Sequence, residues 1–503
     1  MMQPECYIQV ILPLKLGWEP WYRTSEDDAV QVGARVRVKF SGREYVGVVS
    51  RVGGTPDIDV SRVQGILCVE PRLERISEGE MLFWRFIAAY YLCTVGEVYK
   101  FAYPAGRTAV EVKRANKSGI PLESPLQRRL DVADKTAVRE ILDAFVDRRP
   151  VLLSGCGLEP VFAELTRRTL ESGRDVLRLR PDAGRASYVR QRESAKAVRG
   201  DAPVVVSGGK EHLFLPFAKL GLIIVEEECS VSYKHSSMAP RFHARDAAVA
   251  LAAQHGADVL LAAATPSLES LLNARSGKFA RVSLERTISR VTPVVIDTDD
   301  EYRKSGMSGP LSRKLISRLE AVEGRKLVVA PWDLDEPLRY PRLKTVKLAA
   351  LASEKLDRYD LVALLNAEAL LGRNDFRADE KALRLLSDLE CRVRGELVIQ
   401  TRGAGHPIFT TGHREYLETL MKERQDFGFP PFTRMVEVRV ADTNEPRRAK
   451  MSDLLTRRLG GSLQLFFPKD RTLAERKSSL AAAVAEFEKE YNYPGHIIID
   501  VDP

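Results

Sequence analysis

The segment LGLIIVEEECSVSYKH (220–235) is an apolar run that stops abruptly on three consecutive glutamates, Glu226, Glu227 and Glu228. A short apolar run bounded in this way is typical of a buried strand in a parallel sheet. Folds that hydrolyse nucleoside triphosphates hold magnesium with carboxylates at the carboxyl end of such a strand. The segment therefore predicts an α/β domain, and a phosphate-binding loop should lie upstream of it.

Helix and strand patterns alternate around this segment, from about residue 131 to 285. The amphipathic stretches TAVREILDAFVDR (136–148) and PVFAELTRRTLESG (160–173) predict helices. The short apolar runs PVLLSG (150–155) and ADVLLAAAT (257–265) predict strands. This alternation favours a parallel sheet covered by helices. A shorter α/β pattern follows to residue 410, and an α+β pattern occupies 411–503.

The first hundred residues predict a β-rich domain. ARVRVKF (34–40) and REYVGVVSRV (43–52) alternate or are β-branched, with Gly33 and Gly42 at the breaks. EGEMLFWRFIAAYYLCTVGEVYKFAYP (78–104) has apolar residues at helical spacing and predicts one helix followed by a turn. Residues 107–130 are basic, polar and rich in helix breakers, and we interpret them as a linker.

The bulk composition fits a soluble globular protein of several domains. A chain of 503 residues exceeds one hydrophobic core, and 29% charged with 44% hydrophobic residues is ordinary for this class. The formal net charge of +8 permits a nucleic-acid partner without requiring one. No signal peptide or membrane-length apolar run is visible, so a cytoplasmic protein without membrane contact is expected.

The cysteines suggest neither zinc nor a disulfide framework. They are Cys6, Cys68, Cys93, Cys156, Cys229 and Cys391. No two are spaced as a CxxC pair, so a zinc knuckle is not expected. Scattered single cysteines favour a reducing cytosol over a disulfide-bonded scaffold.

The upstream loop stands in the right place but has the wrong chemistry. The strand at 151–153 leads into SGCGLEP (154–160), where a P-loop fold would bind phosphates. The loop is short, no Lys follows the glycines, and no Ser or Thr is placed for magnesium. Glu159 adds negative charge, and one like-charge contact at about 4 Å costs roughly 4 kcal/mol at an effective dielectric of about 20. The turn is therefore expected to bind nothing.

Specific motifs resemble those of the primosomal protein N′ (PriA) family of bacterial replication-restart DNA helicases, over most of the chain. LFLPFAKLGLIIVEEECSVSYKHSSMAPRFHARDAA (213–248) resembles the family's Walker B region, where the strand ends in Asp-Glu-Glu-His. AATPSLES (263–270) resembles the next helicase motif. GARVRVKFSGREYVGVV (33–49) is similar to the N-terminal DNA-binding domain, and GELVIQTRGAGHPI (395–408) and RQDFGFPPFTR (424–434) are similar to the later domains.

The resemblance implies a multidomain α/β fold. Its expected units are a β-rich, 3′-end-type DNA-binding domain (1–106), a basic linker or winged-helix remnant (107–130), a first RecA-like lobe with a degraded P-loop (131–285), a reduced second RecA-like lobe (286–410) and an α+β C-terminal domain (411–503). Forked or single-strand-containing DNA is the implied partner, together with primosome or single-strand-binding proteins.

The departures from the family fall on the parts that grip and split ATP. Relative to the family's Gly-x-Thr-Gly-Ser-Gly-Lys-Thr loop, the turn containing Gly155 and Gly157 lacks three residues, and Leu158 and Glu159 stand in for Lys and Thr. Glu226 replaces the family's magnesium-binding Asp, and Cys229 replaces the motif His. The eight zinc-binding cysteines are missing, so no zinc is expected.

The Gly-Arg-Ala-Gly-Arg motif, which supplies an arginine to the transferring phosphate in the family, is missing as well. Arg392 and Arg394 lie near the gap, but they begin or precede a strand and are not expected to act as a finger. Such an arginine alone contributes about 10³ to 10⁵ in rate. The resemblance thus implies a helicase scaffold that has lost its ATPase.

Several interpretations stay open. The favoured function is structured-DNA recognition in replication restart without unwinding and without a cofactor. The alternative is a weak ATP-dependent 3′-to-5′ helicase that uses ATP and Mg²⁺ in a rebuilt site, and a third is a decaying copy with little function. Glu226 to Glu228 are accordingly either a solvated strand end or a residual magnesium site.

The candidate DNA contacts come from charge and from the resemblance. Arg35, Arg37 and Lys39 alternate on a predicted strand and so share one face, which suits either phosphate contact or ordinary solvation. Trp21 could stack on a base or pack inside the domain. The remaining candidates are Tyr22 of the family's 3′-end pocket, Arg43, Lys234, Arg241, Arg245 and the basic cluster at 185–200. His235 and His243 lack ligand spacing and are expected to be surface or core polar groups.

Overall fold

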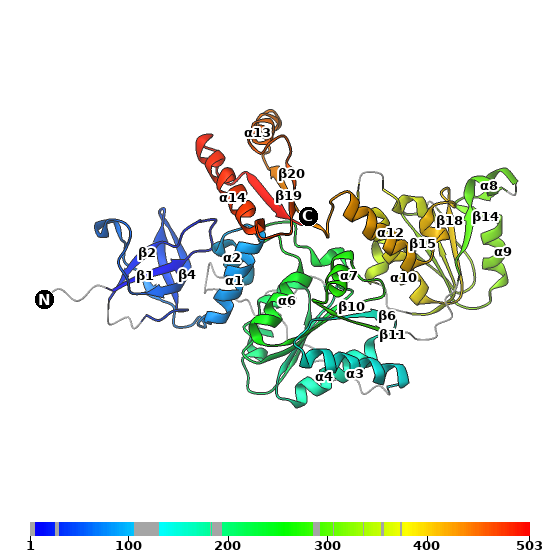
Figure 1. Ribbon diagram of the computed structural model, residues 1–503, viewed down its shortest axis with the longest axis horizontal. Helices are drawn as coiled ribbons and strands as arrows, with labels where there is room; N and C mark the ends of the chain where they lie inside the picture. Colours follow the sequence, from blue (N-terminus) through cyan, green and yellow to red (C-terminus); the bar gives the residue numbers. More distant parts are fainter. Residues whose placement is uncertain are drawn as a thin grey trace.

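A computed structural model shows the chain as a series of sheet-centred units (Figure 1). It describes residues 6–25, 30–104, 130–181, 183, 194–284, 292–304, 306–334, 336–353, 357–372 and 375–503. All but the last residue of the expected linker at 107–130, and the basic cluster as far as residue 193, lie outside the described residues. The fold is the multidomain α/β class that the sequence predicts.

An antiparallel sheet in the order β2-β1-β4-β3-β5 forms the N-terminal unit. Its strands are β1 (Cys6–Ile11), β2 (Trp21–Thr24), β3 (Arg35–Phe40), β4 (Arg43–Val52) and β5 (Cys68–Val69). The alternating residues of β3 divide between two faces because side chains alternate along a strand. Val36 and Val38 accordingly pack on Ile8 and Val10 in one buried cluster.

Two helices follow, where one was predicted. They are α1 (Glu78–Tyr91) and α2 (Val95–Ala102). Leu92 ends α1 in the left-handed conformation, with φ of 53°. Thr94 then caps α2 in a reciprocal arrangement with Glu97, which satisfies amide groups at the new helix start. The helical spacing of apolar residues continues across this break, which is why periodicity alone does not reveal it.

The first lobe is a parallel sheet in the order β11-β6-β10-β9-β7-β8. Its strands are β6 (Val151–Gly155), β7 (Asp175–Leu179), β8 (Val205–Gly208), β9 (Leu220–Glu226), β10 (Asp258–Ala263) and β11 (Ala280–Leu284). Its helices are α3 (Val132–Val146), α4 (Glu159–Glu171), α6 (Ala244–His255) and α7 (Leu268–Arg275). Val151 and Leu153 share a cluster with residues of α3 and α4, whereas Leu152 belongs to the cluster that contains α6. Helices therefore cover both faces of the sheet, as Figure 1 shows.

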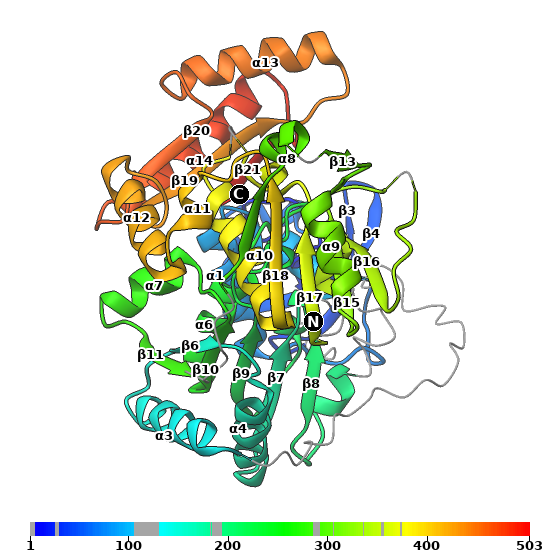
Figure 2. The same cartoon turned by 90° about the vertical axis from the view of Figure 1, so that its right-hand side faces the viewer.

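The second lobe is also a parallel sheet, in the order β12-β18-β17-β15-β16 (Figure 2). Its strands are β12 (Val294–Asp297), β15 (Lys326–Ala330), β16 (Leu343–Lys347), β17 (Tyr359–Leu364) and β18 (Val393–Thr401), with a small hairpin of β13 (Met307–Ser308) and β14 (Leu311–Ser312). Its helices are α8 (Thr298–Lys304), α9 (Arg313–Ala321), α10 (Ala378–Arg392), α11 (Pro407–Thr410) and α12 (His413–Asp426). Helix α10 runs directly into β18 and carries the face that meets the first lobe.

The C-terminal unit is a three-stranded antiparallel sheet in the order β20-β19-β21. It contains β19 (Thr433–Val440), α13 (Glu445–Arg458), β20 (Gln464–Pro468), α14 (Leu473–Glu490) and β21 (Ile497–Val501). It contacts the N-terminal unit, because the Arg434 guanidinium lies 4.9 Å from the centre of the Tyr90 ring.

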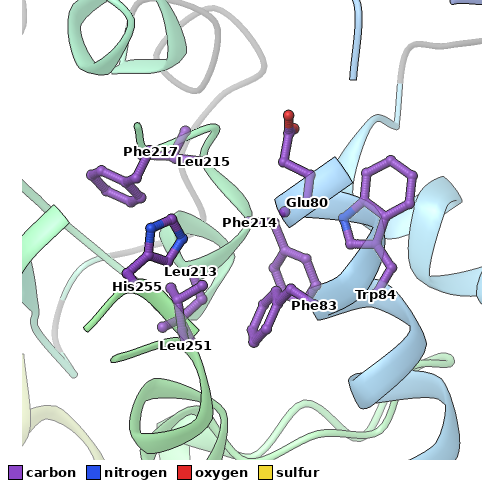
Figure 3. A pocket seen from close by; sticks show the side chains of 10 residues that line it. Glu80, Phe83, Trp84, Leu213, Phe214, Leu215, Phe217, Leu251 and His255 are labelled. Atoms are coloured by element: carbon purple, nitrogen blue, oxygen red, sulfur yellow. The ribbon is translucent and has the colours of Figure 1, made fainter. Parts of the chain in front are cut away.

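The N-terminal unit packs tightly on the first lobe through α1 and α6. Phe83 of α1 lies against Phe214, with ring centres 5.3 Å apart, and the Gln254 amide donates to the carbonyl of Gly79 at 2.7 Å. Figure 3 shows the apolar side chains that meet here around a cavity of about 10 Å³. That volume holds one water at most, so the interface is a packed contact rather than a ligand site. Across the described residues, no helix combines the length and apolarity that a membrane span requires.

Candidate functional site

The phosphate-loop remnant is a tight turn between β6 and α4. Gly155 and Gly157 adopt positive φ angles of 147° and 67°, a region that favours glycine. A side chain at Gly155 would come within 2.8 Å of the Leu284 carbonyl oxygen, so the turn is pressed against β11. Helix α4 begins without a side-chain cap, and Glu159 and Pro160 form its first turn. Residues 155–160 contain no Lys, Ser or Thr for a phosphate or a magnesium ion.

One arginine joins this turn to the glutamate-ended strand. Arg178 lies on β7 and pairs in register with Ile224 of β9, which places its side chain on the same face as Glu226. Its guanidinium donates to both carboxylate oxygens of Glu159, at 3.1 and 3.0 Å. It also donates to Glu226 Oε1 at 2.9 and 2.6 Å.

The Glu159–Arg178–Glu226 bridge is largely withdrawn from water, since the Arg178 side chain is only 9% exposed. Burial alone would lower the pKa of Arg178, but the two carboxylates hold it above the ordinary arginine value. One guanidinium therefore bridges two carboxylates, Glu226 at the strand end and Glu159 at the start of α4. In this arrangement the residues do not fit a magnesium–triphosphate complex, because a side chain already fills the gap between turn and strand end.

The other two glutamates of the strand end have different environments. Glu228 is fully buried and accepts hydrogen bonds from the Ser267 amide at 2.7 Å and the Ser270 hydroxyl at 3.0 Å. It thereby ties the strand end to the start of α7, and the expectation of a solvated strand end is wrong for this residue. Glu227 remains exposed with φ of 47°.

The two lobes contact each other directly at this strand end. Arg384 of α10 donates to the carbonyl of Cys229 at 2.7 Å. The hydroxyls of Thr265 and Ser387 are 2.5 Å apart. The Arg377 guanidinium lies 2.9 Å from the Glu269 carboxylate. Helix α10 is therefore held against the two motif segments of the first lobe by hydrogen bonds and ion pairs.

A disulfide also joins the two lobes. Cys156 of the turn is bonded to Cys391 near the end of α10, with Cα atoms 5.9 Å apart and a sequence separation of 235. This differs from the expectation of isolated thiols, because only the folded chain brings these two cysteines together. Arg392 and Arg394, beside the missing arginine motif, are paired with Asp388 at 2.9 Å and Asp360 at 2.7 Å.

The basic face of β3 is partly covered. Arg35 is 4% exposed and donates to the Tyr99 hydroxyl of α2 at 2.8 Å. Arg37 is more open but is held by Glu70 through a 2.8 Å hydrogen bond. Lys39 and Arg43, at the far end of the hairpin, are exposed. Arg35, Arg37 and Lys39 alternate along β3 and so share one face of the strand. Helix α2 covers that face at Arg35.

Of the aromatic residues near the predicted 3′-end pocket, Tyr22 and Trp21 are buried and Trp18 is exposed. Tyr22 is 3% exposed, its hydroxyl donates to the Lys39 carbonyl at 3.1 Å, and burial raises its pKa to about 12. Trp21 is 8% exposed and donates to Asp57 at 2.9 Å. Trp18 is the exposed aromatic, at 57%, with its ring centre 6.1 Å from that of Phe40. Its place beside Gly17 and Glu19, between two strands, is the sequence signal for an exposed loop.

The remaining cationic candidates lie inside the protein. Lys234 pairs with Asp500 at 2.7 Å and donates to the Val501 carbonyl at 2.7 Å. Arg245 is 7% exposed and is paired with Asp246 at 2.8 Å. Arg241 is partly buried, and burial lowers its pKa. The Lys234 and Arg245 side chains are engaged in contacts within the protein, and the Arg241 side chain is half-buried.

His235 is a core polar group, and His243 is a half-buried helix cap. The Nδ1 atom of His235 lies 2.8 Å from the Pro240 carbonyl oxygen, and His235 is buried. His243 accepts a hydrogen bond from the Arg245 amide and caps α6. In the part of the chain that the structure describes, no group of three or more His, Cys, Asp or Glu side chains is placed to hold a metal ion.

Comparisons with known proteins agree with these motifs. A family model described as the 3′DNA-binding domain (3′BD) of PriA matches residues 9–104. Replication restart protein PriA of Haemophilus influenzae is 23% identical over 504 residues, covering 70% of this chain and 69% of that protein. The Bacillus subtilis protein of the same name is 30% identical over 213 residues, covering 36% of this chain and 26% of that protein. The Rickettsia conorii protein is 24% identical, and the chain spans about half (51%) of its length.

Among solved structures, RecG bound to a three-way DNA junction is 15% identical, with a TM-score of 0.31 over 59% of this chain and 45% of that one. A similarity at that score supports no conclusion about this chain. The PriA 3′DNA-binding-domain model covers residues 9–104, and the PriA relatives named above are 23–30% identical to parts of the chain. The chain is therefore similar to replication restart protein PriA, and its residues 9–104 match the 3′DNA-binding domain of that protein.

Proposed function

We propose that the chain binds forked or single-strand-containing DNA in replication restart and does so without turning over ATP. The similarity to replication restart protein PriA and the match to its 3′DNA-binding domain support the DNA-binding part. The bridge of Arg178 between Glu159 and Glu226 is the observation that carries the second part. On this proposal the protein acts in the cytoplasm as a scaffold, alongside primosome or single-strand-binding proteins.

Phosphoryl transfer needs a phosphate cradle, a metal site and charge stabilisation at the same time. The turn at 155–160 supplies no Lys or hydroxyl, and Glu226 is already neutralised by Arg178. A magnesium ion could use Glu226 only after the guanidinium left, and breaking a buried ion pair costs about 3–5 kcal/mol. Because Glu159 is about one third exposed, the cost on that side is smaller.

DNA-stimulated ATP hydrolysis by the purified full chain tests the absence of turnover. We expect no hydrolysis above the background of a Glu227→Gln preparation, which carries the same contaminants and lacks the one exposed strand-end carboxylate. Turnover above about 1 s⁻¹, the low end for enzymes of this kind, that is lost in Glu227→Gln would overturn the proposal and favour the weak helicase.

The proposed DNA contact combines the exposed end of the β3–β4 hairpin, with Lys39 and Arg43, and the nearby Trp18 of the β1–β2 connection. Lys39→Ala and Arg43→Ala should each weaken binding of a forked oligonucleotide about 3- to 10-fold and lower the slope of log affinity against log salt by about 1. Trp18→Ala should weaken binding with little change in that slope, because base stacking contributes about 1–3 kcal/mol without a phosphate charge.

Fluorescence anisotropy over a salt series measures both quantities. Lys304→Ala is the matched control, because Lys304 is an exposed lysine on α8 of the second lobe. If Lys304→Ala weakens binding as much as Lys39→Ala, the hairpin is not the contact surface.

A further inference from the structure

We propose that the Cys156–Cys391 disulfide is a redox-controlled latch that holds the two lobes closed in place of a nucleotide. In a two-lobe motor the nucleotide lies between the lobes and is gripped by both. Here a covalent bond joins the phosphate-loop remnant of one lobe to α10 of the other. The inference concerns how the lobes are held and goes beyond the proposed binding of DNA.

The positions of the two cysteines carry the proposal. Cys156 lies in the turn that corresponds to the family's P-loop, and Cys391 lies where the arginine-bearing motif is missing from the sequence. Their Cα separation of 5.9 Å is ordinary for a disulfide. The bond therefore spans the two places that a triphosphate would otherwise bridge, while Arg178 fills the site beside it.

The contacts around the bond show what reduction would leave behind. The Arg384–Cys229 hydrogen bond, the Thr265–Ser387 hydrogen bond and the Arg377–Glu269 ion pair also join the lobes. These contacts are reversible, so two lobes joined only by them can open locally, as interfaces within a chain commonly do. The disulfide converts this equilibrium into a fixed closed arrangement.

The two sulfur positions differ in access. Cys391 is 7% exposed, whereas Cys156 is partly exposed in the turn, so an attacking thiolate reaches the Cys156 sulfur first. By contrast, Cys93 and Cys229 are free thiols whose pKa values are raised by burial, which disfavours the reactive thiolate. The chain thus combines one exchangeable pair with two thiols of low reactivity, Cys93 and Cys229, while Cys68 is an exposed single thiol.

The exchange reaction is balanced with a dithiol reductant and a small-molecule disulfide oxidant. A dithiol thiolate attacks Cys156 Sγ, the S–S bond breaks, and Cys391 leaves as a thiolate that takes up a proton. The second thiol of the reductant then displaces Cys156 and leaves as an intramolecular disulfide, so two electrons pass to the protein. In the reverse direction the Cys156 thiolate attacks the small disulfide and releases one thiolate. Cys391 then attacks the Cys156 sulfur of the mixed disulfide and releases the second.

Mass spectrometry and hydrogen exchange on the full chain test the latch. After treatment with oxidised glutathione, differential alkylation should show four free thiols and one linked peptide pair, and treatment with dithiothreitol should free two more. Amides in the turn before α4 and in the last turns of α10 should exchange at least about tenfold faster after reduction. Cys156→Ser and Cys391→Ser should each show the fast exchange with or without reductant.

Cys68→Ser is the matched control, because Cys68 is an exposed free thiol that should leave the reductant response intact. Alkylation of all six thiols after oxidation, or a reductant response that persists in Cys156→Ser, would overturn the proposal. If a serine variant fails to fold, the oxidised and reduced wild-type proteins still decide the question. Because neither readout uses DNA or ATP, failure of the latch and failure of the proposed function are distinguishable.

Discussion

At the scale of single residues, the sequence shows how the turn differs from the family's P-loop. It does not show that the Arg178 guanidinium lies beside that turn. The missing Lys and Thr follow from reading residues 155–160. Arg178 is 19 residues from Glu159 and 48 from Glu226, and nothing in its neighbourhood marks it. Its role depends on β7 lying beside β9, which is a property of the strand order. Lys234 illustrates the same limit, since its partner Asp500 is 266 positions away.

Removing the Arg178 guanidinium should destabilise the first lobe. Arg178→Ala leaves Glu159 and Glu226 facing each other with Arg180 as a remaining cation near Glu226, at an expected cost of about 2–4 kcal/mol. Adding Glu226→Gln should recover part of this loss, because it removes one of the two stranded charges. Urea unfolding of the four proteins in the double-mutant cycle measures the coupling.

Arg167→Ala supplies the control for that cycle. Arg167 also pairs with two glutamates, Glu164 and Glu171, but on the exposed side of α4. Its loss should cost less than about 1 kcal/mol, as for other surface pairs. Equal losses for Arg167→Ala and Arg178→Ala would show that the bridge contributes no more than a surface ion pair.

At the scale of elements, the strands and long helices follow their sequence patterns, and the errors occur where local geometry interrupts a pattern. The stretches predicting helices at 160–173 and 136–148 correspond to α4 and α3. The single helix predicted after residue 78 is broken at Leu92, which adopts the left-handed conformation. The spacing of apolar residues continues across this break, so the sequence pattern does not reveal it. Helix α6 shows a further element-level feature, because it begins at a half-buried histidine cap, His243.

The His243 cap makes the stability of α6 depend on pH. Burial, aided by Arg245 and Lys234 and opposed by Asp246 and Glu269, lowers the pKa of His243 from 6.5 to about 3. The folded state therefore binds fewer protons than the unfolded state between these values, so stability is full above pH 6.5 and falls as the pH drops toward 3. At pH 5 the expected loss is about 2 kcal/mol.

His243→Asn should flatten this part of the pH profile, because asparagine keeps a cap acceptor and does not titrate. Chemical unfolding at pH 5, 6 and 7 measures the slope. His406→Asn serves as the comparison, since His406 is also a histidine cap but at the start of a different helix, α11. An unchanged slope in His243→Asn would assign the acid sensitivity to other groups.

At the scale of the whole molecule, Lys234 joins the C-terminal unit to the first lobe, although the sequence predicts this lysine to contact DNA. Lys234 reaches Asp500, which is 1% exposed, and the Val501 carbonyl of β21. Lys234→Ala should leave Asp500 buried with Arg439, at 3.6 Å, and Arg241 as nearby cations, and should loosen β21 from the lobe.

Hydrogen exchange of β21 measures that loosening, and fork binding measured on the same protein separates the two roles. We expect faster exchange at 497–501 and little direct change in the salt slope of DNA binding. If the variant lowered the salt slope of DNA binding and left hydrogen exchange of β21 unchanged, Lys234 would instead be a DNA contact.

The central claim is that a two-lobe motor scaffold persists in this chain while its nucleotide site is closed by the protein's own groups. Titration of the full chain with a fluorescent ATP analogue and Mg²⁺, with forked DNA present and after reduction of the disulfide, tests this claim most directly. The account predicts no saturable binding up to about 1 mM, near the upper end of ordinary substrate affinities. Saturable, magnesium-dependent binding at micromolar concentration would contradict it.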